Sequence, residues 1–164
     1  ARINEQLGVN DPIPYLAIAK TYSQKGEFLS AVLNVRRALD INPSSPDIYG
    51  QLGIVYFKAR NYEGAIPALQ CAVYGCDAEL SCEVRQCDPE AGPGLTIEGM
   101  PLTSNTLVYY YTYGSVLAGM HRPINNYCEE AMKVMQEVRD AYGSDPTVIA
   151  IIEPSEAICE GYGY

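Results

Sequence analysis

Apolar residues recur along residues 12–41 with the spacing of two amphipathic helices. A first set of apolar or small positions shares one helical face: Tyr15, Ile18, Ala19 and Tyr22. A second set does the same: Ala31, Val35, Ala38 and Leu39. Spacings of three and four residues place side chains on one side of a helix. With an Asn-Asp-Pro start signal at residues 10–12 and a turn at Gly26, the pattern predicts helices over residues 12–24 and 28–41.

The same pattern returns 34 residues later. Tyr49 stands where Tyr15 stood, and Ala65 stands where Ala31 stood. This predicts a second pair of helices, over residues 47–59 and 62–74. Small residues at matched positions let the two helices of a pair approach closely, while tyrosines fill the gaps. An ordinary antiparallel bundle with accidental periodicity is disfavoured, because about nine positions match at one fixed spacing.

This repeat resembles the tetratricopeptide repeat, a helix-turn-helix unit that stacks into a right-handed superhelix. The resemblance is carried by Tyr49-x2-Leu52-Gly53-x2-Tyr56 and by Tyr62-x2-Ala65-x3-Leu69-x2-Ala72. It covers residues 12–77 well and 104–145 loosely. It implies an all-α fold, a tetratricopeptide-like solenoid of about three helix pairs in a single domain over residues 1–164. The expected repeats are residues 12–45, 46–77 and 104–145.

An insertion separates the second and third pairs, over about residues 76–104. Glycine and proline punctuate it, and two short segments of alternating character lie at 80–86 and 95–97. A long structureless loop is improbable inside a compact domain, so a β-hairpin-like or irregular, partly ordered arm is expected. The third pair is then predicted over residues 106–119 and 126–142.

Two prolines fall inside predicted helices, where a missing N–H and a ring clash oppose helix formation. Pro67 predicts a slight bend or a late start of the helix over 62–74. Pro154 is expected to interrupt a last apolar segment over 145–160. That segment is expected to be a capping helix or the first helix of a fourth repeat, and the chain a piece of a longer repeat array.

Charge and hydropathy exclude several function classes. The net charge is −9, and only 11 residues are Lys or Arg. Direct binding of nucleic acid needs clustered positive charge and is not expected. The sequence also has no apolar run of about twenty residues and no signal-like amino-terminal stretch, so no membrane partner is expected.

Six cysteines raise the question of metal or disulfides. Four of them lie close together in sequence: Cys71, Cys76, Cys82 and Cys87. A zinc site is the less favoured reading, because structural zinc commonly uses Cys-x2-Cys pairs and none occurs here. A Cys82–Cys87 disulfide would need a hairpin and an oxidising compartment. The favoured interpretation is reduced thiols, with Cys128 and Cys159 in the core, in a cytoplasmic or nuclear protein.

No catalytic constellation stands out. The single histidine, His121, precedes Arg-Pro in a predicted loop and is expected to be a plain surface residue. General base catalysis would need a positioned partner and a nucleophile. We therefore expect no enzyme activity, no cofactor and no metal.

A partner-binding face is the functional expectation. The resemblance implies that the first helix of each pair lines a concave groove, in which apolar anchors and flanking charge hold a peptide. The candidate residues are Leu16, Lys20, Gln24, Ile54, Phe57, Lys58 and Tyr111. An alternative is that the insertion or neighbouring repeats cover several of them.

The function expected from this face is that of a protein–protein interaction scaffold or adaptor within a multi-subunit assembly. The alternative function is a co-chaperone module that binds the carboxy-terminal peptide of a chaperone. The family's carboxylate clamp fits poorly, because Leu16 stands where a Lys is expected and Lys20 where an amide is expected. Self-association through the ends of the stack is a further possibility.

Overall fold

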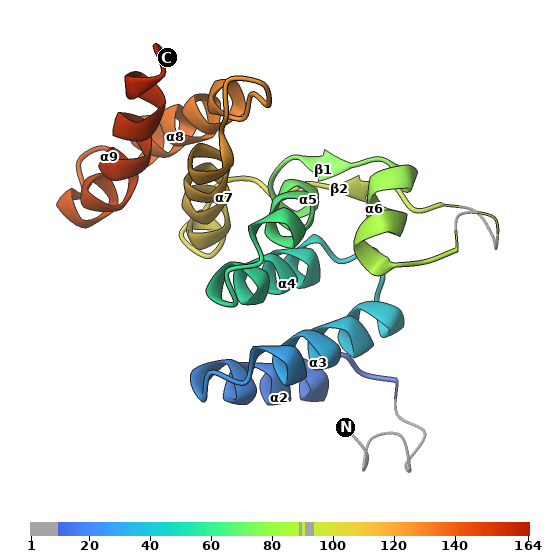
Figure 1. Ribbon diagram of the computed structural model, residues 1–164. Coiled ribbons are helices and arrows are strands. Elements are labelled where there is room, and N and C mark those ends of the chain that lie inside the picture. The colour runs from blue at the N-terminus through green and yellow to red at the C-terminus, as the bar shows by residue number, and fades with distance from the viewer. Residues whose placement is uncertain (1–9, 89, 91–93) are drawn as a thin grey trace. The chain divides into compact units, whose positions relative to one another are not determined.

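The computed structural model describes residues 10–88, 90 and 94–164 (Figure 1). Within them the chain forms eight helices and one two-stranded sheet, so the expected all-α class is confirmed. The chain divides into two compact units, Ala1–Met100 and Pro101–Tyr164. Each unit is built around helices that pack on their sequence neighbours.

Unit 1 contains two helix pairs, α2 (Ile13–Gln24) with α3 (Phe28–Ile41) and α4 (Pro46–Lys58) with α5 (Tyr62–Val73). The bounds agree with the sequence prediction to within one or two residues. α3 packs against both α2 and α4, and α4 packs against α5. Small side chains of the second helices are fully enclosed: Ala31, Ala38, Ala65 and Ala72.

Close approach between α4 and α5 depends on Gly53. A Cβ atom at this position would lie 2.5 Å from Cγ of Leu69, closer than real Cβ atoms come. Tyr49, one turn earlier on α4, is fully buried and its hydroxyl donates to the carbonyl oxygen of Pro43 at 2.7 Å. The small-and-aromatic pattern thus sets the packing distance within the pair.

Helix α5 begins at Tyr62, so the late start expected from Pro67 is wrong. The side chain of Asn61 caps this helix by accepting from the backbone N–H of Gly64 at 3.0 Å. A cap of this kind satisfies one of the free N–H groups of the first turn. Pro67 lies inside the helix.

The insertion forms a helix where a strand-like segment was expected. α6 (Ala78–Arg85) is capped by Asp77, whose carboxylate accepts from the N–H of Leu80 at 2.8 Å. β1 (Gly75–Cys76) pairs antiparallel with β2 (Ile97–Glu98), which closes the base of the insertion. The expected hairpin is therefore reduced to two residues in each strand, and α6 lies in the segment between them.

Unit 2 contains α7 (Leu107–Met120), α8 (Cys128–Tyr142) and α9 (Pro146–Gly161), each packed against the other two. α9 continues through Pro154, so the expected interruption is wrong. Pro154 is exposed, which lets solvent satisfy the carbonyl that loses its hydrogen bond. None of the helices in the described parts of either unit is long and apolar enough to cross a membrane.

All six cysteines form disulfides, so the expectation of reduced thiols is wrong. Two bonds each join residues five apart, Cys71–Cys76 and Cys82–Cys87. The third, Cys128–Cys159, joins α8 to α9 with a Cα–Cα distance of 5.4 Å. The Cys71–Cys76 bond links α5 to β1, and the Cys82–Cys87 bond links α6 to the residues that follow it. These two bonds explain the cluster of cysteines in and next to the insertion.

Candidate partner-binding face

Helix α2 carries three of the predicted residues. Tyr15 and Ala19 are its buried residues. Leu16 is half-buried and packs against the core of unit 1, whereas Lys20 and Gln24 are exposed. α2 thus offers an apolar position that is partly enclosed and a polar edge beyond it.

Helix α4 presents the other three residues of this unit. Ile54 and Phe57 are half-buried, and Lys58 is exposed at the end of the helix. The ring of Phe57 lies 5.9 Å from that of Tyr62, tilted by 47°, which holds the phenylalanine against the turn into α5. We call Leu16, Lys20, Gln24, Ile54, Phe57 and Lys58 the α2/α4 face.

The seventh predicted residue, Tyr111, is half-buried on α7 and belongs to unit 2. It is therefore not part of the α2/α4 face. One turn further along α7, Ser115 forms a hydrogen bond of 2.9 Å with Ser155 of α9. The same side of α7 is thus used to pack against the last helix.

Electrostatically, the α2/α4 face pairs apolar side chains with positive charge. Among the residues that the structure describes, neither Lys20 nor Lys58 makes an ion pair within 4 Å. Two such lysines are notable in a chain of net charge −9. Acidic groups of a binding partner would be attracted to this edge of unit 1.

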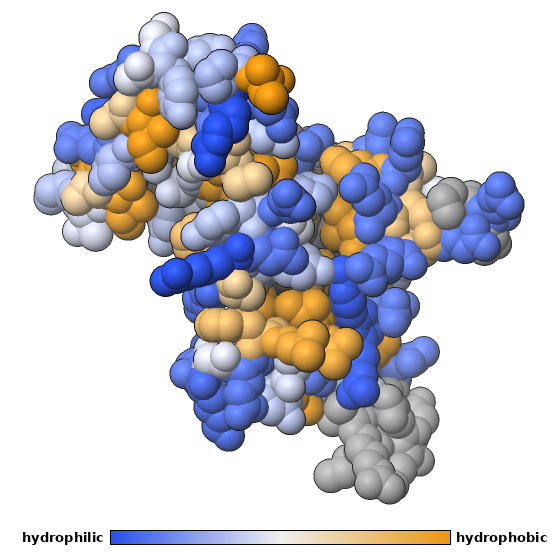
Figure 2. Space-filling model, in the orientation of Figure 1, coloured by the Kyte–Doolittle hydropathy of each residue, from blue (hydrophilic) through white to orange (hydrophobic). Residues whose placement is uncertain are grey.

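Exposed apolar surface also occurs elsewhere on unit 1. Leu29 and Leu33, one turn apart on α3, are 76% and 51% exposed. Figure 2 shows hydrophobic side chains, in orange, among hydrophilic ones, in blue, over the helices of this unit. These two leucines lie outside the α2/α4 face and provide a matched comparison for it.

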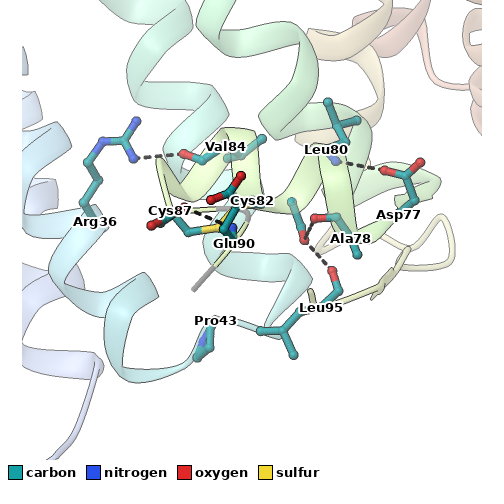
Figure 3. The surroundings of a disulfide bond; sticks show 12 residues. Arg36, Pro43, Asp77, Ala78, Leu80, Cys82, Val84, Cys87, Glu90 and Leu95 are labelled. Carbon is teal, nitrogen blue, oxygen red and sulfur yellow. Dashed lines mark hydrogen bonds between the residues drawn. A yellow bond between two sulfur atoms is a disulfide. The ribbon is translucent and has the colours of Figure 1, made fainter. Parts of the chain in front are cut away.

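The insertion packs mainly on the second helices of the pairs. α6 contacts α5 and α3, and the guanidinium of Arg36 on α3 donates to the carbonyl oxygen of Val84 at 2.9 Å (Figure 3). The same guanidinium also donates to the hydroxyl of Tyr56. A positive group at the last turn of α6 suits the negative end of the helix dipole. The main contacts of the described part of the insertion are therefore with α5 and α3.

Burial changes the ionisation of one core side chain near the insertion. The pKa of Tyr49 lies above its ordinary value, mainly because burial disfavours the charged phenolate. Arg85 of α6 acts in the opposite direction through its charge and a hydrogen bond. The insertion thus reaches the core of the second helix pair.

His121 is not the surface residue that the sequence suggested. It is 2% exposed, and its Nδ1 accepts from the backbone N–H groups of Tyr127 and Cys128, both at 3.0 Å. Its ring lies 4.5 Å from that of Tyr162 and 5.5 Å from that of Tyr164. These contacts give the histidine a structural place between the α7–α8 loop and the end of the chain.

The residues that the structure describes contain no candidate metal site. No group of three or more His, Cys, Asp or Glu side chains there is arranged to hold a metal ion. The four cysteines considered for zinc form the two short disulfides, and a bonded cysteine offers no thiolate. The zinc reading of Cys71, Cys76, Cys82 and Cys87 is therefore wrong for this state of the chain.

Comparison with known proteins adds no relative from which a function could be transferred. No family model matches the chain, and the search of curated proteins gave no significant match.

Proposed function

We propose that the helix pairs α2/α3, α4/α5 and α7/α8 are tetratricopeptide-type repeats and that the chain is a protein-binding scaffold or adaptor. The partner segment lies across the α2/α4 face. The observation that carries the proposal is that α2 and α4 carry half-buried apolar residues, Leu16, Ile54 and Phe57, together with exposed lysines. Such a combination offers anchors and charge but no catalytic group.

The chemistry of this face defines the segment it would hold. Full burial of a side chain such as Phe57 contributes about 1.5–3 kcal/mol relative to full exposure, and a half-buried one gains part of that on binding. Lys20 and Lys58 favour carboxylates on the bound segment. An extended or helical peptide with apolar side chains and acidic neighbours fits both requirements.

The disulfides bear on where the partner is met. Disulfides form and persist in oxidising compartments and are rare in the cytosol. We therefore replace the cytoplasmic or nuclear expectation with the proposal that the chain works in an oxidising compartment. Mass measurement of protein taken from its native source under non-reducing conditions tests this: six free thiols would restore the earlier expectation.

Affinity capture with matched variants tests the binding face. The bait is the disulfide-bonded chain, and bound proteins from its own cells are quantified by mass spectrometry. Phe57→Glu is expected to lose specific partners that Leu29→Glu retains. Both changes add one carboxylate to an apolar position of unit 1, but only Phe57 belongs to the α2/α4 face. Lys58→Glu, at an exposed position of α4, is expected to weaken the same partners.

Circular dichroism checks that all three variants keep the helical content of the wild type. If Phe57→Glu and Leu29→Glu recover the same proteins in the same amounts, partner binding does not occur on the α2/α4 face.

A further inference from the structure

Helix α9 has a second apolar face that nothing in unit 2 covers. Its buried residues share one side and pack on α7 and α8: Val148, Ile152, Ser155, Glu156 and Cys159. The opposite side is exposed along the whole helix and carries no charged residue. It consists of Thr147, Ala150, Ile151, Pro154, Ala157, Ile158 and Gly161. We call these seven residues the outer face of α9.

The shape of the outer face suits another helix. Small residues run along its middle, and a Cβ atom built on Gly161 would meet no other atom within 4 Å. Ile151 and Ile158 lie two turns apart along one edge of the outer face and are 37% and 44% exposed. Figure 2 shows orange side chains on the surface over α9. Small residues beside branched ones allow helix axes to approach to about 8 Å.

The charge beside this face is entirely negative. The charged side chains of α9 are Glu153, Glu156 and Glu160. Glu153 and Glu160 are exposed along one edge of the outer face, whereas Glu156 is buried on the side that packs on α7 and α8. Glu156 is held by Arg139 of α8, with an Nε–Oε2 distance of 3.2 Å. The pKa of Arg139 is raised first by Glu156 and further by Glu153 and Glu160. Neither Glu153 nor Glu160 makes an ion pair within 4 Å with a residue that the structure describes, so this edge of the outer face is acidic.

We propose that the outer face of α9 binds an amphipathic helix of a partner protein. The apolar stripe of that partner helix contacts the small residues of the outer face, and the partner helix carries Lys or Arg along one edge of its stripe. The basic edge meets Glu153 and Glu160. This surface is separate from the α2/α4 face, which prefers acidic neighbours, so the two would take partners of opposite charge.

The same charge pattern argues against an antiparallel pairing of this face with a second copy of the chain. Two α9 helices paired face to face about a twofold axis perpendicular to them run antiparallel and bring identical edges together. Glu153 and Glu160 of both copies would then face each other, in a chain that already carries nine net negative charges. Like charges at such a distance oppose association.

Two synthetic helical peptides test the proposal. Each is 16 residues long, the length of α9, and both share an Ile/Ala stripe. One has Lys along one edge of the stripe, and the other has Glu there. Fluorescence anisotropy with the full disulfide-bonded chain is expected to show binding of the Lys peptide, at least about tenfold tighter than the Glu peptide and weakened by salt.

Matched variants locate the binding. Ile158→Lys is expected to weaken the Lys peptide about tenfold or more, whereas Ile124→Lys, at a position 98% exposed in the same unit, leaves it unchanged. Exchanging both Glu153 and Glu160 for Lys is expected to reverse the preference between the peptides without changing the residues of the outer face. Phe57→Glu leaves the affinity unchanged, so failure here and failure of the α2/α4 proposal are distinguishable.

Three results would overturn the proposal: no binding of the Lys peptide, equal binding of both peptides, or equal effects of Ile158→Lys and Ile124→Lys. Sedimentation velocity at two protein concentrations examines the competing occupant. A dimer that Ile158→Lys dissociates would assign this face to a second copy and reject the basic helix.

Discussion

The imidazole of His121 accepts a hydrogen bond from the backbone N–H of Cys128 at 3.0 Å, and so holds the first residue of α8 against the end of α7. A second N–H, that of Tyr127, reaches the same nitrogen at 3.0 Å. The first free N–H groups of a helix are usually satisfied by a capping side chain from the preceding turn. Here a residue seven positions earlier in the sequence fills that role.

Replacing His121 by Phe should therefore destabilise unit 2. The ring contacts with Tyr162 and Tyr164 can persist, but the two N–H groups lose their acceptor, and an unsatisfied buried N–H costs about 1–3 kcal/mol. Urea unfolding followed by circular dichroism measures the change, with Ile124→Ala as a control in the same loop. An equal midpoint for His121→Phe and wild type would show that solvent replaces the histidine as acceptor.

Gly53→Ala and Gly119→Ala make a matched pair of helix substitutions. The Cβ at position 53 meets Leu69, while at position 119 nothing lies within 4 Å. Overpacking a core typically costs about 1–3 kcal/mol, whereas a helical Gly→Ala change without clash gains up to about 1 kcal/mol. Thermal unfolding should thus show a lower midpoint for Gly53→Ala and a raised or unchanged one for Gly119→Ala. The close approach of α4 to α5 is refuted if both variants are stabilised.

The elements that the sequence predicted well are those in which local pattern and packing agree. Residues 28–41 were predicted and found helical because Ala31, Val35 and Ala38 mark one face at helical spacing. α6 was missed because its helix depends on the Asp77 cap and on packing against α3 and α5. Alternation of apolar and polar residues over a few positions does not distinguish a short helix from a strand.

Helical periodicity correctly predicted the burial of Tyr15 and Tyr49. It did not predict that Leu16, expected on the binding side of α2, is half-buried and packs against the core of unit 1. The burial of His121 could not be predicted, because it depends on Tyr162 and Tyr164, some forty residues away. The cysteine pairs did leave a signal. Cys71–Cys76 and Cys82–Cys87 have the same separation of five residues, a regularity that zinc-ligand spacing does not explain.

Removal of the Cys128–Cys159 disulfide should affect stability more than removal of either short one. The chain-entropy model relates the stabilisation to the closed loop: about 3–4 kcal/mol for a separation of 31 residues and about 2 kcal/mol for one of five. We expect the Cys128→Ser/Cys159→Ser variant to unfold at a clearly lower urea concentration than Cys82→Ser/Cys87→Ser. Peptide mapping without reduction verifies the remaining pairs. If the order of the two variants is reversed, local packing around the insertion outweighs loop closure.

Alkaline pH should weaken the contribution of Tyr49 to unit 1. Its pKa is raised in the folded state, chiefly by burial, whereas an unfolded tyrosine ionises near pH 10. The stabilisation linked to the neutral phenol is therefore complete below about pH 10 and is lost as the pH rises through the folded pKa.

Tyr49→Phe lacks the hydrogen bond to Pro43, which contributes about 0.5–1.5 kcal/mol at neutral pH, but has no phenol to ionise. Urea unfolding of both proteins between pH 7 and 11 should show the wild type more stable at pH 7 and the difference shrinking above pH 10. Because the other tyrosines, Tyr110 included, are common to both proteins, their titration cancels in this comparison. A difference that stays constant up to pH 11 would mean that the Tyr49 hydroxyl does not ionise when unit 1 unfolds.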